Sequence, residues 1–193
     1  MSKEAILGRA RAALGAQPLV PDVPREYRRT GEGGVDLFCE RVADYVATVH
    51  RIARLADVPV PPRVAVAPGL AADFPHAVED GPHVTAAELD GFDAALTGCA
   101  LAIAETGTIV LDGGSASGRR ALTLVPDHHL CVVRADQIVA SVPEAVEALA
   151  DAARDRRPIT FVSGPSATSD IELERVEGVH GPRKLDVFVV VEP

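Results

Sequence analysis

The chain has 193 residues, of which 47% are hydrophobic and only 4% aromatic, with no Trp. This length suits one domain that can bury a core of Ala, Val, Leu and Ile without stabilisation by disulfides or metals. The aliphatic composition favours layered α/β packing. Nineteen basic and twenty-eight acidic residues give a formal net charge of −9. Nucleic acid and anionic membranes repel so acidic a body, so we expect neither as a broad partner, whereas a small anion can still bind a local pocket.

The cysteines give no metal signature. Cys39, Cys99 and Cys131 are odd in number and far apart, and no CxxC pair or Cys/His cluster is present. We therefore expect buried thiols in a reducing cytoplasm, no metal site, and no cofactor bound through a cysteine or zinc motif. Charges interrupt the apolar residues of the N-terminus, unlike a signal peptide, and no segment approaches the length of a membrane span. The sequence predicts a cytoplasmic protein without membrane insertion.

The first 34 residues are predicted to form an arm. Ser2 to Leu14 has apolar residues at helical spacing, and Gln17 to Gly34 collects prolines and glycines that favour an extended connector. We assign residues 1–34 to a helical arm with its connector, and residues 35–193 to an α/β domain. The arm could pack on this domain or on a partner, and the sequence favours neither.

Helices and strands alternate through the rest of the chain. The longest predicted helix is Val35 to Asp57, which has one apolar face and ends before three prolines. Short apolar runs predict strands, the second and third of which could also be packed connectors: Arg63–Ala67, Asp93–Thr97, Leu101–Glu105, Thr108–Asp112, Leu130–Arg134, Pro158–Val162 and Leu185–Val191. Shorter helices are predicted at Thr85–Leu89, Ser117–Leu124, Ser141–Ala153 and Ile171–Glu177. This alternation indicates a sheet covered on both faces.

The polar segment after Val162 is the first candidate site. It lies between a predicted strand and a predicted helix start, where hydroxyls and free N–H groups suit an anion. The competing interpretation is a well-made turn, because Ser169 and Glu172 have capping-box spacing. A cap needs one hydroxyl, and this segment offers four with a cation nearby, which favours ligand binding. The candidate residues are Ser163, Gly164, Ser166, Thr168, Ser169, His180 and Arg183.

A second candidate is the turn at Glu105, Thr106 and Gly107. A carboxylate beside a glycine that permits positive φ could act as base, acid or nucleophile, or it could brace the turn. We take Glu105 as the candidate catalytic residue, and Thr106 and Gly107 as ligand-binding candidates. The Gly-rich loop at residues 113–118, followed by two arginines, could fold over an anion or be a solvated connector. It matches neither a Walker loop nor GxGxxG.

No other arrangement predicts catalysis or metal binding. His128 and His129 stand next to each other before a strand, where adjacent side chains point to opposite faces and cannot easily share one metal. No Ser/His/Asp or Cys/His set can be assembled from spacing, so nucleophilic hydrolysis is unsupported.

Three strings together resemble the LUD-domain family, and in particular its lactate-utilisation protein C group. They are AETGTIVL (104–111), SGPSATSDIE (163–172) and GVHGPRKLDV (178–187). The resemblance covers residues 35–193. It implies a three-layer α/β/α fold with a mostly parallel sheet, similar to the sugar-isomerase and CoA-transferase superfamily. In that superfamily, phosphorylated or CoA-bearing ligands lie over the C-terminal ends of the strands, and some members use a turn glutamate as nucleophile, a position that Glu105 resembles.

The resemblance also implies a function. It points to the oxidation of L-lactate to pyruvate together with partner proteins that carry iron–sulfur centres, in which this chain would be the cluster-free accessory subunit. Its pocket would bind the carboxylate substrate or an anionic cofactor fragment. Two alternatives stay open: a free-standing acyl- or group-transfer enzyme that uses Glu105, and a non-catalytic regulatory or scaffold module that works through its arm.

Overall fold

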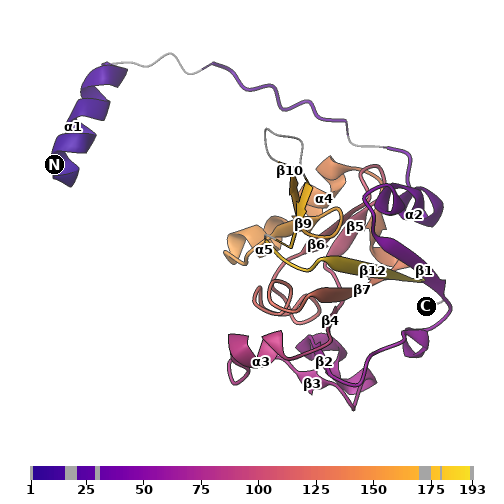
Figure 1. Cartoon of the computed structure of the whole chain (residues 1–193). Helices are drawn as coiled ribbons and strands as arrows, with labels where there is room; N and C mark the ends of the chain where they lie inside the picture. The colour runs from indigo at the N-terminus through magenta and orange to yellow at the C-terminus, as the bar shows by residue number, and fades with distance from the viewer. Residues whose placement is uncertain (1, 16–20, 29–30, 170–174, 179, 192–193) are drawn as a thin grey trace.

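The computed structural model describes residues 2–15, 21–28, 31–169, 175–178 and 180–191. A six-stranded sheet lies at its centre, in the order β1-β12-β7-β4-β2-β3, and every neighbouring pair is parallel (Figure 1). The strands are β1 (Thr48–Ile52), β2 (Val64–Val66), β3 (Val78–Glu79), β4 (Ala94–Thr97), β7 (His128–Arg134) and β12 (Lys184–Val190). Continuous apolar runs suit such strands because both faces are covered. The predicted α/β class with a mostly parallel sheet is confirmed.

A second sheet, which the sequence did not predict, packs on the first. Its order is β8-β5-β6-β9, and its pairs are antiparallel except β5 with β8. Its strands are β5 (Leu101–Ile103), β6 (Thr108–Leu111), β8 (Ile138–Val139) and β9 (Thr160–Val162). Ile109 and Leu111 of this sheet share one buried cluster with Cys131 and Val187 of the central sheet and with Phe38 of α2 (Val35–Ala43). The two sheets and α2 therefore enclose a common core.

Helices and turns cover the remaining faces. The outer face of the second sheet packs against Ala145 of α4 (Val142–Ala148), which α5 (Ala150–Arg154) follows. The far face of the central sheet is covered by the 3₁₀ helices η1 (Leu55–Asp57) and η2 (Pro68–Asp73), and a third, η3 (Ala135–Gln137), follows β7. Leu89 of α3 (Ala86–Asp90) packs in a separate cluster near β2 and β4. The N-terminal helix α1 (Lys3–Leu14) has no buried residue and stands clear of the body (Figure 1).

The long helix predicted over Val35–Asp57 is wrong beyond its first 9 residues. Helix α2 ends at Ala43, the chain turns at Val46 with a φ of 68°, and Thr48–Ile52 forms the edge strand β1. Three of the five residues of β1 are β-branched, which favours a strand. Pairing with β12 gives this segment hydrogen bonds that its helical spacing could not reveal.

Two of the shorter predicted helices are also wrong. Residues 117–124 form successive turns, because Gly118 takes a φ of 67° and breaks the helical path. At the C-terminal candidate site, Ala167–Ser169 is strand β10 and pairs antiparallel with β11 (Arg175–Glu177), where a helix was predicted. The rest of that prediction, residues 171–174, lies outside the described residues.

Candidate functional site

A polar pocket of about 240 Å³ lies between the second sheet and the central sheet. It opens where β9 ends and where β7 and β12 begin. We call it the Arg120 pocket; its lining is Leu111, Arg120, Thr123, His129, residues 160–166, residues 180–182 and Leu185. Four of the predicted ligand-binding residues lie in this wall: Ser163, Gly164, Ser166 and His180.

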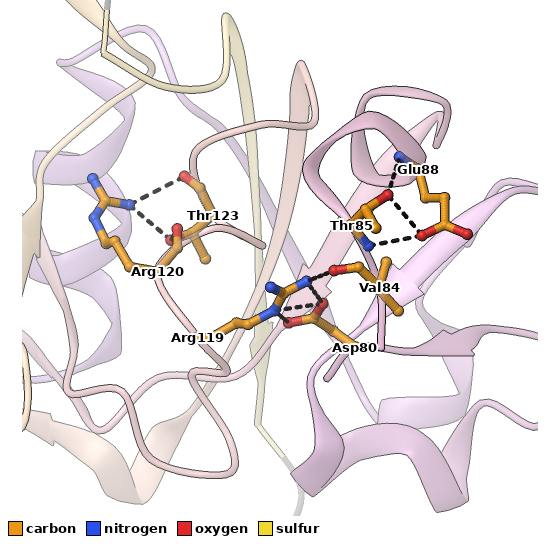
Figure 2. Close-up of polar contacts among 7 residues, drawn as sticks. All are labelled: Asp80, Val84, Thr85, Glu88, Arg119, Arg120 and Thr123. Atoms are coloured by element: carbon orange, nitrogen blue, oxygen red, sulfur yellow. Dashed lines mark hydrogen bonds and ion pairs between the residues drawn. The ribbon is translucent and has the colours of Figure 1, made fainter. Parts of the chain in front are cut away.

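Two adjacent arginines have very different surroundings (Figure 2). Arg119 donates to both carboxylate oxygens of Asp80, at 2.7–3.0 Å, and to the carbonyl of Val84. Asp80 is only 2% exposed, so Arg119 is held as a structural ion pair. Arg120 donates through Nη1 to the carbonyl and hydroxyl of Thr123, and within the described chain it has no carboxylate partner. Partial burial lowers the pKa of Arg120, because burial disfavours the charged form. Since no described carboxylate pairs with this guanidinium, the pocket wall carries a cation whose charge is not neutralised.

A buried histidine lies beside this cation. His129 is 3% exposed, and its Nε2 lies 2.8 Å from the Thr97 hydroxyl. Burial first, then the nearby charges of His128 and Arg120, lower its pKa to about 4. It is therefore neutral near pH 7 and offers a hydrogen-bonding group without a second positive charge. As predicted, the adjacent histidines diverge, since Nε2 of His128 lies 2.8 Å from Asp186.

Hydroxyl groups connect the candidate turn at residues 105–107 to the pocket. Thr106 donates to the Thr108 hydroxyl at 2.8 Å, and the Thr108 hydroxyl lies 2.9 Å from that of Ser163. Thr106 is therefore linked to the pocket wall without lining it. Gly107 has a different role: its φ is 60°, and a Cβ there would lie 2.5 Å from the backbone nitrogen of Val42. This glycine lets β6 approach α2 closely.

The two loops of the pocket wall hold one another. The Ser166 hydroxyl accepts from the backbone N–H of His180 at 3.0 Å, and the Ser166 N–H donates to the carbonyl of Pro182 at 2.8 Å. Gly164 packs on the chain that leaves α2, since a Cβ on it would lie 2.7 Å from the Tyr45 carbonyl. The hydroxyl of Ser166 still has its own proton to donate into the pocket.

Three further predicted ligand residues are Thr168, Ser169 and Arg183. Thr168 and Ser169 belong to strand β10, whose backbone pairs antiparallel with β11. Arg183 turns outward: its side chain is 59% exposed and Nη1 lies 3.1 Å from Asp127. Arg120 stands in the pocket where the sequence interpretation expected Arg183.

The Gly-rich loop at residues 113–118 is a fixed connector. The N–H of Gly69 donates to the Ser115 carbonyl at 2.8 Å, and the N–H of Gly98 donates to the Ala116 carbonyl at 2.9 Å. These bonds tie the loop to the ends of β2 and β4. Arg120 follows this loop directly in the sequence. Of the loop and the two arginines after it, only Arg120 lines the pocket.

Glu105 lies outside the Arg120 pocket and holds a helix end. Its Oε1 accepts the N–H of Val142 at 2.9 Å, and its Oε2 pairs with the guanidinium of Arg28. Val142 is the first residue of α4, so the carboxylate satisfies an otherwise orphaned N–H and interacts favourably with the helix dipole. Such contacts are the ones expected if Glu105 has a structural role and braces its turn. The catalytic role of Glu105 stays a prediction.

A larger cavity of about 450 Å³ lies at the C-terminal edge of the central sheet. It is the position that the superfamily resemblance implies for ligands. Arg54, Leu70, Cys99 and Arg134 are among its lining residues, and none of the predicted site residues is. Both arginines there already pair with nearby aspartates. The polar residues of the sequence prediction thus gather at a different place from the one that the superfamily suggests.

Metal ligands are not grouped in the described part of the chain. No set of three or more His, Cys, Asp or Glu side chains there is arranged to hold a metal ion. Cys39, Cys99 and Cys131 are buried free thiols, and hydrogen bonding to Cys131 together with burial raises the pKa of Cys99. Among the residues described, no helix is long and apolar enough to cross a membrane.

The fold and the site thus define an α/β protein with a parallel central sheet and a polar pocket beside it. A family model for the LUD domain matches residues 70–190, and the chain belongs to the LUD-domain family. A crystal structure of a DUF162 family protein from Deinococcus radiodurans is 42% identical, with a TM-score of 0.67 over 80% of this chain and 94% of that chain.

Curated relatives match over a shorter span. "Lactate utilization protein C" of Deinococcus radiodurans is 64% identical over 113 residues, which cover 58% of this chain and 53% of that protein. "Uncharacterized protein YkgG" of Escherichia coli is 39% identical over 94 residues, 47% of this chain and 40% of that protein. "Lactate utilization protein C" of Shouchella clausii is 34% identical over 101 residues, covering 51% and 44%. The chain therefore spans about half the length of the curated relatives it matches.

Proposed function

We propose that this chain functions in lactate utilisation as a subunit without an iron–sulfur cluster, and that it binds a small anion in the Arg120 pocket. Relatives named for lactate utilisation support the pathway. The observation that carries the binding proposal is the charge of Arg120, which is partly buried and has no carboxylate partner among the described residues.

The surroundings of Arg120 suit a small carboxylate or phosphate. Its Nη1 is bonded to Thr123, whereas no described residue accepts from Nε or Nη2, and these remain for a planar anion. Hydroxyls of Ser163 and Ser166 line the same wall, and neutral His129 adds a hydrogen-bonding group. A volume of about 240 Å³ admits a molecule of the size of lactate or pyruvate. The net charge of −9 repels anions from most of the protein surface, and Arg120 offsets this repulsion only within the pocket. A small anion that fits inside the pocket is therefore favoured over a polyanion.

In this proposal the oxidation itself depends on partner proteins. Conversion of lactate to pyruvate removes two electrons and two protons from the substrate, so an electron acceptor must be reduced. Iron–sulfur proteins of the same complex take the electrons, and this chain holds the carboxylate or an anionic cofactor fragment. The buried, separate thiols of this chain are consistent with the cluster-free role.

Co-purification tests the subunit role. The tagged chain is isolated under gentle salt from its own host grown on L-lactate, and the eluate is analysed by mass spectrometry, absorbance and lactate-dependent dye reduction. We expect iron–sulfur proteins and dye reduction in the eluate. A colourless protein that elutes alone contradicts the subunit role.

A matched pair of variants then tests the pocket in the same host. Arg120→Gln is expected to slow growth on L-lactate, whereas Arg183→Gln is the control, because Arg183 is an exposed arginine outside the pocket. Equal growth of the two variants contradicts a role for the pocket in lactate utilisation.

A further inference from the structure

Three hydroxyl groups, those of Thr106, Thr108 and Ser163, form a chain that ends in the Arg120 pocket, and we call it the hydroxyl relay. The Thr106 hydroxyl donates to the Thr108 hydroxyl at 2.8 Å, so the Thr108 oxygen already accepts one hydrogen bond. The Thr108 and Ser163 oxygens lie 2.9 Å apart, and this distance alone allows either hydroxyl to donate to the other. The direction of this second bond decides what Ser163 presents to a ligand.

The burial of Thr108 fixes that direction. Thr108 is 6% exposed, and among the described residues only Ser163 can accept its hydroxyl proton. If Ser163 donated to Thr108 instead, the Thr108 proton would be buried without an acceptor, which is unfavourable. Thr108 therefore donates to Ser163, and donation runs from Thr106 through Thr108 to Ser163.

The backbone holds the hydroxyl relay in place. Ile109 of β6 pairs with Val162 of β9 in an antiparallel ladder, so Thr108 and Ser163 lie opposite each other one residue further along. Gly164 follows directly and packs closely on the preceding part of the chain, since a Cβ on it would lie 2.7 Å from the Tyr45 carbonyl. Ser163 is thereby fixed between a strand pairing and a close backbone contact.

The Ser163 hydroxyl keeps a proton for a ligand. Its oxygen accepts from Thr108, and no residue in the described part of the chain accepts its own proton. Ser166 is in the same state, because its oxygen accepts the N–H of His180 at 3.0 Å. Both serines line the pocket beside the Arg120 guanidinium, and no Asp or Glu is among the described residues of this lining. The wall thus directs hydrogen-bond donors at whatever it binds.

We propose that Thr106 and Thr108 are positioning residues that fix Ser163 as a hydrogen-bond donor to the ligand of the Arg120 pocket. This inference rests on the proposed anion binding and specifies its chemistry: the ligand presents oxygens that only accept, as an ionised carboxylate does. Neither threonine lines the pocket, so both act through Ser163. Without them the Ser163 hydroxyl is no longer held in one orientation, and ordering it on binding weakens the affinity.

Isothermal titration with pyruvate, L-lactate and inorganic phosphate tests the hydroxyl relay. Thr108→Val keeps the shape of the side chain and removes its hydroxyl, whereas Thr108→Ser keeps the hydroxyl. For an anion that binds the wild type, we expect about 3- to 10-fold weaker binding in Thr108→Val. Thr108→Ser is expected to restore binding to within about twofold of the wild type. Thr106→Val, at a half-buried position outside the pocket, should weaken binding in the same direction.

Double variants with Ser163→Ala provide a readout that a merely structural role would not change. Ser163→Ala alone is expected to weaken binding about 10-fold or more, because a donor to a charged group is lost. In this background, adding Thr108→Val or Thr106→Val should change the affinity by no more than about twofold. Losses as large as in the presence of Ser163 overturn the hydroxyl relay, and so does a Thr108→Ser variant that binds no better than Thr108→Val.

The remaining outcomes separate this inference from the proposed function. Binding that is lost in Arg120→Gln but unchanged in Thr106→Val and Thr108→Val overturns the hydroxyl relay and leaves the anion site standing. A wild type that binds none of the three anions overturns both. Urea denaturation establishes that each variant is folded. If Thr108→Val does not fold, Thr106→Val carries the same comparison with Ser163→Ala.

Discussion

Acidification is expected to destabilise the fold through His129. Burial lowers the pKa of this histidine to about 4 in the folded state, against an ordinary value near 6.5. Between these values the unfolded chain binds a proton that the folded chain does not. The free energy of unfolding therefore falls as pH decreases through this window, and the contribution of His129 is fully present above it. At 1.36 kcal/mol per unit, the loss between pH 7.5 and 4.5 is about 2–3 kcal/mol.

Urea denaturation at pH 7.5 and pH 4.5 measures this loss. Other groups titrate in the same window, so the test compares the pH dependence of the wild type with that of His129→Gln, which cannot take up the proton. The variant is expected to lose about 2–3 kcal/mol less than the wild type on acidification. His76→Gln serves as control because His76 is an exposed histidine, and it should behave like the wild type. Equal losses in the wild type and His129→Gln would refute the reasoning.

Three further variants test local contacts by urea denaturation at pH 7.5. Gly107→Ala is expected to cost about 2–5 kcal/mol, since the new Cβ would strain a positive φ and collide with the backbone of α2; a loss below 0.5 kcal/mol contradicts this. Asp80→Asn is expected to cost about 2–3 kcal/mol because the partly exposed Arg119 loses its buried partner, and an unchanged midpoint argues against the ion pair. Glu105→Ala should cost about 1 kcal/mol through the lost α4 cap, and Glu105→Gln, which keeps an acceptor, should cost less. Purified chain that turns over an acyl donor and stops doing so in Glu105→Gln would instead support the catalytic alternative.

The inner strands of the central sheet could be predicted because they are largely buried on both faces. The runs Leu130–Arg134 and Leu185–Val191 are apolar except for Arg134 and Asp186, and they lie within or next to β7 and β12. Edge strand β1 could not be recognised, because its apolar residues also fit a helix and only pairing with β12 decides between the two. Three strands of the second sheet lie within predicted strands, at Leu101–Glu105, Thr108–Asp112 and Pro158–Val162. Their pairing into a separate sheet joins segments that are distant in sequence, and β8 has only two residues, too few for a periodic pattern.

Part of the lining of the candidate pocket could be predicted from the sequence. Ser163, Ser166 and His180 were singled out by their chemistry, and they do line one pocket. The cation of this pocket was assigned to Arg183, whereas it is Arg120 that lies there. Which arginine remains without a carboxylate partner depends on contacts between distant segments, and no local spacing reveals it.

Isothermal titration of the purified chain with small anions tests the central claim most directly. L-lactate, pyruvate and inorganic phosphate are titrated into the wild type, Arg120→Gln and Arg183→Gln. We expect at least one of these anions to bind the wild type and Arg183→Gln alike, and to bind Arg120→Gln about 10- to 150-fold more weakly, since a charged hydrogen-bond donor contributes about 1.5–3 kcal/mol. Binding that is equal in all three proteins, or absent from the wild type, would contradict an anion site at Arg120.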